Sequence, residues 1–182
     1  MVAYVILPGI DGSDERHWQT MWEQEWGTAA VRIAPASWSA PDLDDWVRAA
    51  QAAYDEASRR DDRVVLVAHS LGCWVAAEWL SPATPVAGAF LVAPPDPRGP
   101  GFPRERLATF TDLTAQPLSC PATVVGSLND TYCTPEAAAT FATDWNATLH
   151  VTGPHDPHGH LNSDSALGSW QQGRDLLATL NT

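Results

Sequence analysis

The sequence contains no lysine. All ten basic residues among its 182 are arginine, and 22 aspartates and glutamates bring the formal net charge to −12. This absence excludes a Schiff-base lysine, a Walker-type phosphate loop and a Ser-Lys hydrolase dyad. No run of basic residues occurs either, so we expect neither nucleic acid nor an anionic membrane as a partner, because clustered Lys and Arg hold both. A small-molecule substrate fits this composition.

Cysteine and long apolar runs are also scarce. Cys73, Cys120 and Cys133 lack C-x-x-C spacing, which favours free thiols over a disulfide framework or a zinc site. The first apolar run stops at Pro8 without a basic segment before it, and no run approaches the roughly 18 residues that span a bilayer. With 45% hydrophobic residues, we expect one globular domain over residues 1–182 and a cytoplasmic location.

Short apolar runs alternate with helical patterns along the chain. Strands are predicted at residues 2–7, 30–34, 63–68, 85–93, 122–126 and 148–152, and helices at 41–59, 70–80, 134–145 and 164–180. Residues 94–103 are rich in proline and glycine, which predicts a rigid surface loop. The repeated order of strand and helix indicates an α/β fold with a mostly parallel sheet.

Ser70 is the candidate nucleophile. It lies between an apolar strand and a helical segment, in Ala68-His69-Ser70-Leu71-Gly72. The related pattern G-x-S-x-G forms a sharp strand-to-helix turn that exposes the serine Oγ and needs small residues on either side. Here Ala68 replaces the first glycine. The alternative is that Ser70 only caps the following helix.

An acid and a base follow Ser70 in the order expected for a Ser-Asp-His triad. Asp130 comes just after the strand at 122–126, and His160 follows the strand at 148–152. The carboxyl ends of parallel strands meet at one edge of a sheet, so these side chains are expected to converge on Ser70. Asp96 and Asp112 compete for the role of the acid, and Asp130 could instead be a turn residue.

Several histidines compete for the role of the base. His155 and His158 precede His160 in one short segment, which could suggest a metal site. No helix fixes their spacing, so we expect no metal and no cofactor. His69 is adjacent to Ser70 on the turn and points to the wrong side of it, which favours a supporting role beneath the site.

Two backbone amides are predicted to form an oxyanion hole. One is the N–H of Leu71, the residue after the nucleophile, and the other is the N–H of Ile10 in the loop after the first strand. Gly9 lets that loop approach closely. A phosphate-binding turn is the alternative, although the loop has neither lysine nor the longer glycine pattern.

Five segments together resemble the YdeN-like family of small serine hydrolases, which includes retinoblastoma-binding protein nine. They are Pro8-Gly9 with Gly12-Ser13, His17-Trp18-Gln19 with Trp22-Glu23, His69 to Cys73, Ser127 with Asn129-Asp130 and Tyr132-Cys133, and Gly159 to Asn162 with Ser165, Gly168 and Trp170. The resemblance implies a compact α/β-hydrolase without a cap domain, a six-stranded sheet, and a triad of Ser70, Asp130 and His160. The sequence departs from the family at Ala68 and in the stretch 154–158. It has no L-x-C-x-E motif, so binding to the retinoblastoma protein does not follow.

Tryptophan is abundant, with nine residues. Trp18, Trp22 and Trp26 recur every four residues, as on one face of a helix. Trp22 and Trp26 are expected to pack on the sheet. Trp18 follows the oxyanion loop and Trp170 follows His160, so both are candidates for substrate contact.

The sequence therefore predicts a serine hydrolase that cleaves small carboxylic esters or thioesters through an acyl-enzyme. The same groups support acyl transfer or cyclisation if water is excluded. A binding protein with little activity on a hydrolase fold is a second alternative, and a metal-dependent hydrolase that uses the histidine cluster is a third.

Overall fold

The computed structural model describes residues 1–153 and 158–181. Its centre is a six-stranded sheet with the order β2-β1-β3-β4-β5-β6. All five strand pairings are parallel, so the sheet predicted to be mostly parallel is parallel throughout. The strands are β1 (Ala3–Leu7), β2 (Ala30–Arg32), β3 (Val64–His69), β4 (Gly88–Val92), β5 (Ala122–Ser127) and β6 (Thr148–Thr152).

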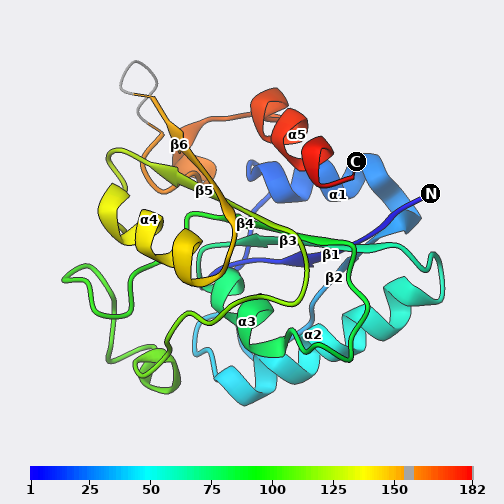
Figure 1. Cartoon of the computed structure of the whole chain (residues 1–182), viewed down its shortest axis with the longest axis horizontal. Helices are drawn as coiled ribbons and strands as arrows, with labels where there is room; N and C mark the ends of the chain where they lie inside the picture. The colour runs from blue at the N-terminus through cyan, green and yellow to red at the C-terminus, as the bar shows by residue number, and fades with distance from the viewer. Residues whose placement is uncertain (154–157, 182) are drawn as a thin grey trace.

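Helices cover both faces of the sheet (Figure 1). They are α1 (Trp18–Trp26), α2 (Leu43–Ser58), α3 (Leu71–Trp79), α4 (Pro135–Asp144) and α5 (Gln171–Ala178). Successive strand residues point to opposite faces. On β3, Leu66 packs in the cluster with α2, α3 and α4, whereas Val65 and Val67 pack in the cluster with α1 and α5. The central strands are buried on both sides, which explains their unbroken apolar runs.

Three helices begin at caps that the sequence encodes. Asp42 accepts the N–H of Asp45 at the start of α2, and Thr134 accepts the N–H of Ala137 just before Pro135 opens α4. His17 caps α1 by accepting the N–H of Gln19. Each cap satisfies one of the amides that the first turn of a helix leaves without a partner.

The last helix differs from its predicted span of 164–180. A short 3-10 turn covers Ser163–Ser165, and α5 begins only at Gln171. Ala166, Gly168 and Trp170 have positive φ angles of 51°, 59° and 43°, which no right-handed helix accommodates. The strands predicted at 30–34 and 85–93 are also shorter in the structure, at Ala30–Arg32 and Gly88–Val92.

The strand order reverses between β1 and β3. From β1 the chain passes through α1 to β2, at one edge of the sheet. From β3 it passes through α3 to β4, toward the opposite edge. Ligands of open parallel sheets bind where such connections diverge, at the carboxyl ends of the strands. Leu7 is in register with Ala68, so the loop after β1 and the turn carrying Ser70 leave the sheet side by side.

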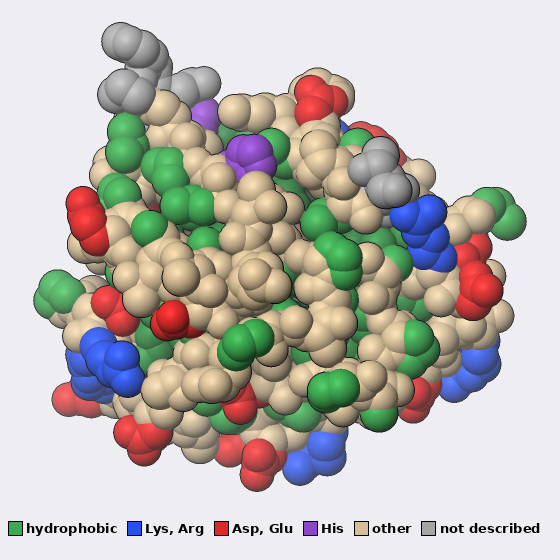
Figure 2. Space-filling model, viewed as in Figure 1, with side chains coloured by type: hydrophobic (Ala, Val, Ile, Leu, Met, Phe, Trp, Pro, Cys, Tyr) green, Lys and Arg blue, Asp and Glu red, His purple; other side chains and the backbone are tan. Residues whose placement is uncertain are grey.

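The surface carries scattered charges. Figure 2 shows acidic and arginine side chains mainly around the edge of one face, with the arginines well separated from one another. Among the described residues, no helix has the length and apolar character needed to cross a membrane.

Candidate active site

Ser70 lies on a tight turn between β3 and α3. Its backbone has φ 54° and ψ −125°, a sparsely populated conformation that costs about 1–3 kcal/mol for a residue other than glycine. The Ser70 N–H donates to Val92 O at 2.8 Å. A Cβ at Gly72 would lie 2.1 Å from Leu7 O, so only glycine lets α3 start this close to β1. These contacts hold the turn against the centre of the sheet.

His160 and Asp130 join Ser70 in a chain of hydrogen bonds. His160 Nε2 lies 2.7 Å from Ser70 Oγ, and His160 Nδ1 lies 2.9 Å from Asp130 Oδ2. A carboxylate only accepts, so Nδ1–H donates to Asp130 and the bare Nε2 accepts the serine hydroxyl. The Asp130 side chain is 1% exposed, and its Oδ1 also accepts the N–H of Tyr132 at 2.9 Å. The structure thus brings together the three residues singled out from the sequence.

Two buried histidines support this chain from below. His69 Nε2 lies 2.9 Å from His160 O, and because a carbonyl only accepts, Nε2–H is the donor. The ring of His17 packs against His69 with centroids 4.7 Å apart. Burial lowers the pKa of His17 to about 4 and holds the pKa of His69 well below its usual range. Both rings are therefore neutral at pH 7, and neither competes with His160 for protons.

Sequence reasoning predicted the supporting role of His69 but missed that of His17. His17 Nδ1 accepts the Gln19 N–H at 3.1 Å, and its Nε2 is buried without a hydrogen-bond partner among the described residues. A histidine as the capping residue of a helix was the available signal.

The loop after β1, residues 8–13, passes directly beside Ser70; we call it the β1 loop. A Cβ at Gly9 would lie 2.7 Å from Ser70 Cβ, so the glycine permits this approach. The Ile10 N–H makes no hydrogen bond within the described part of the chain. Leu71 is the first residue of α3, and the amides of the first helical turn have no partner inside the helix. Both predicted oxyanion donors are therefore free to bind an acceptor.

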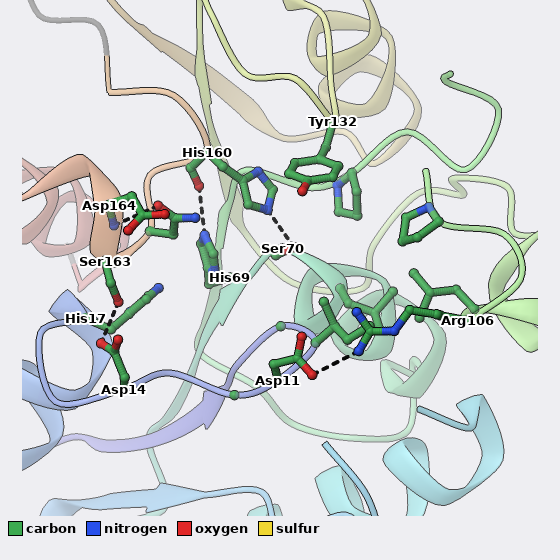
Figure 3. Close-up of a pocket in the computed structure, with 18 of the residues that line it drawn as sticks. Asp11, Asp14, His17, His69, Ser70, Arg106, Tyr132, His160, Ser163 and Asp164 are labelled. Carbon is green, nitrogen blue, oxygen red and sulfur yellow. Dashed lines mark hydrogen bonds and ion pairs between the residues drawn. The ribbon is translucent and has the colours of Figure 1, made fainter. Parts of the chain in front are cut away.

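A pocket with a volume of about 480 Å³ opens over Ser70 and His160. Figure 3 shows the labelled residues around this pair, with Asp14, His17 and Ser163 on one side and Tyr132 and Arg106 on the other. The lining combines apolar side chains with charged ones: Ile10, Leu71, Pro95, Pro103 and Leu107, and Asp11, Asp14, Arg16, Arg106 and Asp164. Such a mixture suits a small molecule with both apolar and polar parts.

Trp18 and Trp170 do not line this pocket. They are 1% and 4% exposed and belong to the core between the sheet, α1 and α5. Trp18 donates through Nε1 to Leu161 O at 2.8 Å, and the two indole rings pack with centroids 5.1 Å apart. The expectation that they contact substrate is wrong, because both indole rings are buried in the core, Trp18 on the sheet-facing side of α1 and Trp170 at the start of α5. Trp18 instead supports the residue that follows His160.

The competing residues have other surroundings. Asp96 accepts the N–H of Arg98 in the loop after β4, and Asp112 does not line the pocket. Within residues 1–153 and 158–181, no group of His, Cys, Asp and Glu has the arrangement of a metal site. His155 lies outside the described residues.

The thiols are shielded from reaction. Cys73 and Cys133 are buried and free, and Cys73 Sγ donates to Val92 O at 3.3 Å. Burial raises the pKa of Cys120 to about 11 and, with the Asp130 and Asp96 carboxylates, that of Cys133 to about 12. Thiolates are the reactive species, so these cysteines are poor candidates for a nucleophile.

The parallel sheet and the serine on its strained turn define an α/β-hydrolase. The model of the family described as serine hydrolase matches residues 4–179, and the chain belongs to this family of enzymes. A YdeN-like hydrolase from Pectobacterium atrosepticum has 31% identity and a TM-score of 0.82, over 99% of this chain and 90% of that one. The ydeN gene product of B. subtilis has 21% identity and a TM-score of 0.77, over 98% and 97%. A Bacillus cereus carboxylesterase shares the fold at 15% identity and a TM-score of 0.58, over 98% and 88%. No curated protein matches the sequence.

Proposed function

We propose that this hydrolase cleaves small carboxylic esters or thioesters through an acyl-enzyme on Ser70, with His160 as the base and Asp130 as its partner. The observation that carries the proposal is the hydrogen-bond chain from Ser70 Oγ to His160 Nε2 at 2.7 Å and from His160 Nδ1 to Asp130 at 2.9 Å. These hydrogen-bonded side chains lie at the floor of a pocket that is large enough for a small ligand.

In the first half of the reaction, Ser70 Oγ attacks the carbonyl carbon and its proton passes to His160 Nε2. The carbonyl π electrons move to the oxygen, which becomes an oxyanion. When the tetrahedral intermediate collapses, the bond to the leaving oxygen or sulfur breaks and His160 returns the proton to that atom. Asp130 stabilises the charged imidazole and fixes its orientation.

The oxyanion would accept the N–H groups of Leu71 and Ile10. Each donor of this kind contributes about 3 kcal/mol to the transition state. The free Leu71 amide lies at the start of α3, where the helix dipole also favours negative charge. Ile10 belongs to the β1 loop, whose backbone touches Ser70 at Gly9.

In the second half, a water molecule attacks the acyl carbon, His160 takes its proton, and the ester bond to Ser70 breaks. The proton then returns to Ser70 Oγ, which restores the enzyme. The apolar side chains Ile10, Leu71, Pro95 and Leu107 favour a short hydrocarbon group on one side of the scissile bond.

The test combines a fluorophosphonate probe with p-nitrophenyl esters of two, four and eight carbons. Wild type is expected to be labelled and to turn over the shorter esters best. Ser70→Ala should lose labelling and about 10³-fold or more in kcat, whereas Ser119→Ala, which changes an exposed serine, should retain both. Folded wild type that is neither labelled nor active would contradict the proposal and favour a binding protein.

A further inference from the structure

Arg106 is a charged residue of the pocket that has no role in the proposed reaction. It comes from the segment between β4 and β5 and lines the pocket together with Asp11. Its Nη2 donates to Asp11 Oδ1 at 2.9 Å and to Ser39 O at 3.0 Å. Figure 3 shows this ion pair below and beside Ser70. One guanidinium group therefore joins three segments at the rim of the pocket.

The β1 loop is well anchored at its two ends. At its start, the buried Gln19 amide donates to Leu7 O at 3.2 Å and to Val67 O at 3.0 Å. At its end, Ser13 O accepts from Arg32 Nη1 and from Thr20 Oγ1, both at 3.0 Å. These contacts tie the loop to the sheet and to α1.

The tip of the β1 loop, residues 10–12, has weaker support. Asp11 has a positive φ of 64°, and its N–H donates to Trp38 O at 2.8 Å, while the Gly12 N–H closes the turn by donating to Gly9 O at 3.0 Å. Among the described residues, Arg106 provides the one side chain that bonds to this tip. Ile10, the expected oxyanion donor, lies between Gly9 and Asp11. The orientation of its N–H therefore depends on how well Asp11 is held.

Charge gives Arg106 a second effect. The pocket contains three carboxylates, Asp11, Asp14 and Asp164, but two arginines, and Arg16 pairs with Asp14 at 3.6 Å. Arg106 is thus the cation that balances Asp11. Without it, a carboxylate next to Ile10 would oppose the negative charge that develops on the substrate oxygen.

We propose that Arg106 is a positioning residue of this active site: through Asp11 it holds the tip of the β1 loop and balances the carboxylate beside the oxyanion donor Ile10. The inference rests on the proposed ester hydrolysis. The ion pair is half-exposed, with Arg106 and Asp11 side chains 48% and 58% accessible. Its contribution to holding the loop is therefore modest.

The test is a double-mutant cycle on p-nitrophenyl butyrate. Arg106→Met is expected to lower kcat about tenfold, because it removes the tether and leaves Asp11 unbalanced, with KM within about twofold. Asp11→Asn, which weakens the tether to a neutral acceptor and leaves no carboxylate beside Ile10, should cost about threefold. The double variant should resemble Asp11→Asn and thus recover part of the activity lost in Arg106→Met. Arg106→Lys should restore most of kcat.

Arg48→Met serves as the control, since Arg48 forms an exposed pair with Asp45 on α2 and should leave kcat unchanged. An alkylboronic acid, which forms a tetrahedral adduct on Ser70, should bind Arg106→Met more weakly by the same factor as the loss in kcat/KM. Additive losses in the double variant, or an effect confined to KM or to thermal stability, would overturn the role of Arg106. Wild type without Ser70-dependent turnover would instead refute the proposed function.

Discussion

The turn at Ser70 and the β1 loop lie side by side at the site, but different interactions hold them in place. The turn is enclosed by buried neighbours: Leu71 and Gly72 are buried, and α3 starts against the backbone of Leu7. The tip of the β1 loop is held by two backbone hydrogen bonds, from Asp11 to Trp38 O and from Gly12 to Gly9 O, and by a half-exposed ion pair. The position of the proposed nucleophile therefore depends on the core, whereas that of one proposed oxyanion donor depends on the surface.

Substitutions in the two regions should therefore affect folding stability and catalytic activity to different degrees. Close packing at the turn leaves no space for adjustment, so changes there cost folding free energy. The loop tip can shift at little cost to folding, but its position would set the proposed hydrogen bond from Ile10 to the transition state.

Gly72→Ala should produce the largest effect. The added Cβ would meet Leu7 O at 2.1 Å and Pro8 O at 2.7 Å, and both are backbone atoms that cannot move independently of the sheet. We expect a loss of about 4 kcal/mol or more in the free energy of unfolding, measured by urea denaturation. Gly153→Ala is the control, because no atom of the described residues other than its chain neighbours lies within 4 Å of its added Cβ. Equal stability of the two variants would show that the turn is not rigid.

Acid should lower the free energy of unfolding through His17, a buried histidine that lines the pocket. Burial lowers the pKa of His17 from 6.5 to about 4, so the unfolded chain binds a proton in this window that the folded chain does not. The contribution of neutral His17 to the free energy of unfolding is fully present above pH 6.5. It falls as the pH drops toward 4, with a loss of about 2 kcal/mol by pH 5 from His17 alone. Buried His69 adds to the loss, since its pKa is also lowered.

His17→Asn isolates this contribution, since asparagine retains a side-chain cap for α1. Between pH 7 and pH 5 the variant should lose about 2 kcal/mol less unfolding free energy than wild type, as followed by urea titrations at each pH. Asp42→Ala removes the cap of α2 and should keep the His17-dependent acid sensitivity. An unchanged pH dependence in His17→Asn would mean that this ring is not buried in its neutral form.

Gly9→Ala should affect activity more than folding. Its Cβ would meet Ser70 Cβ at 2.7 Å, and the β1 loop can relieve this contact by moving its tip outward. The expected cost is about 1 kcal/mol in unfolding free energy but about 100-fold in kcat/KM, because Ile10 moves with the loop. Urea denaturation and butyrate ester kinetics on the same preparation measure both. A variant with full activity would place the second oxyanion donor elsewhere.

Much of the fold was predictable because its cues are local. The apolar runs located the six strands, and Asp42 and Thr134 marked the starts of two helices. The span of α5 was not predictable, because its start depends on the positive φ of Trp170, which the sequence pattern does not reveal. Trp18 and Trp170 looked like pocket residues from their positions beside site loops, but packing around Phe90 and Trp22 buries them.

The sequence by itself determined which residues gather at the site. Ser70, Asp130 and His160 each follow a strand, and parallel strands bring their carboxyl ends to one edge. Only the tertiary structure decided how these groups are supported: that His17 packs edge-on against His69 and His69 packs against His160, and that Arg106 reaches the Asp11 carboxylate. The physical reason is the distance along the sequence between the contacting residues. The patterns that predict strands and caps lie within a few neighbouring residues, whereas these contacts join distant segments that only the folded sheet brings together.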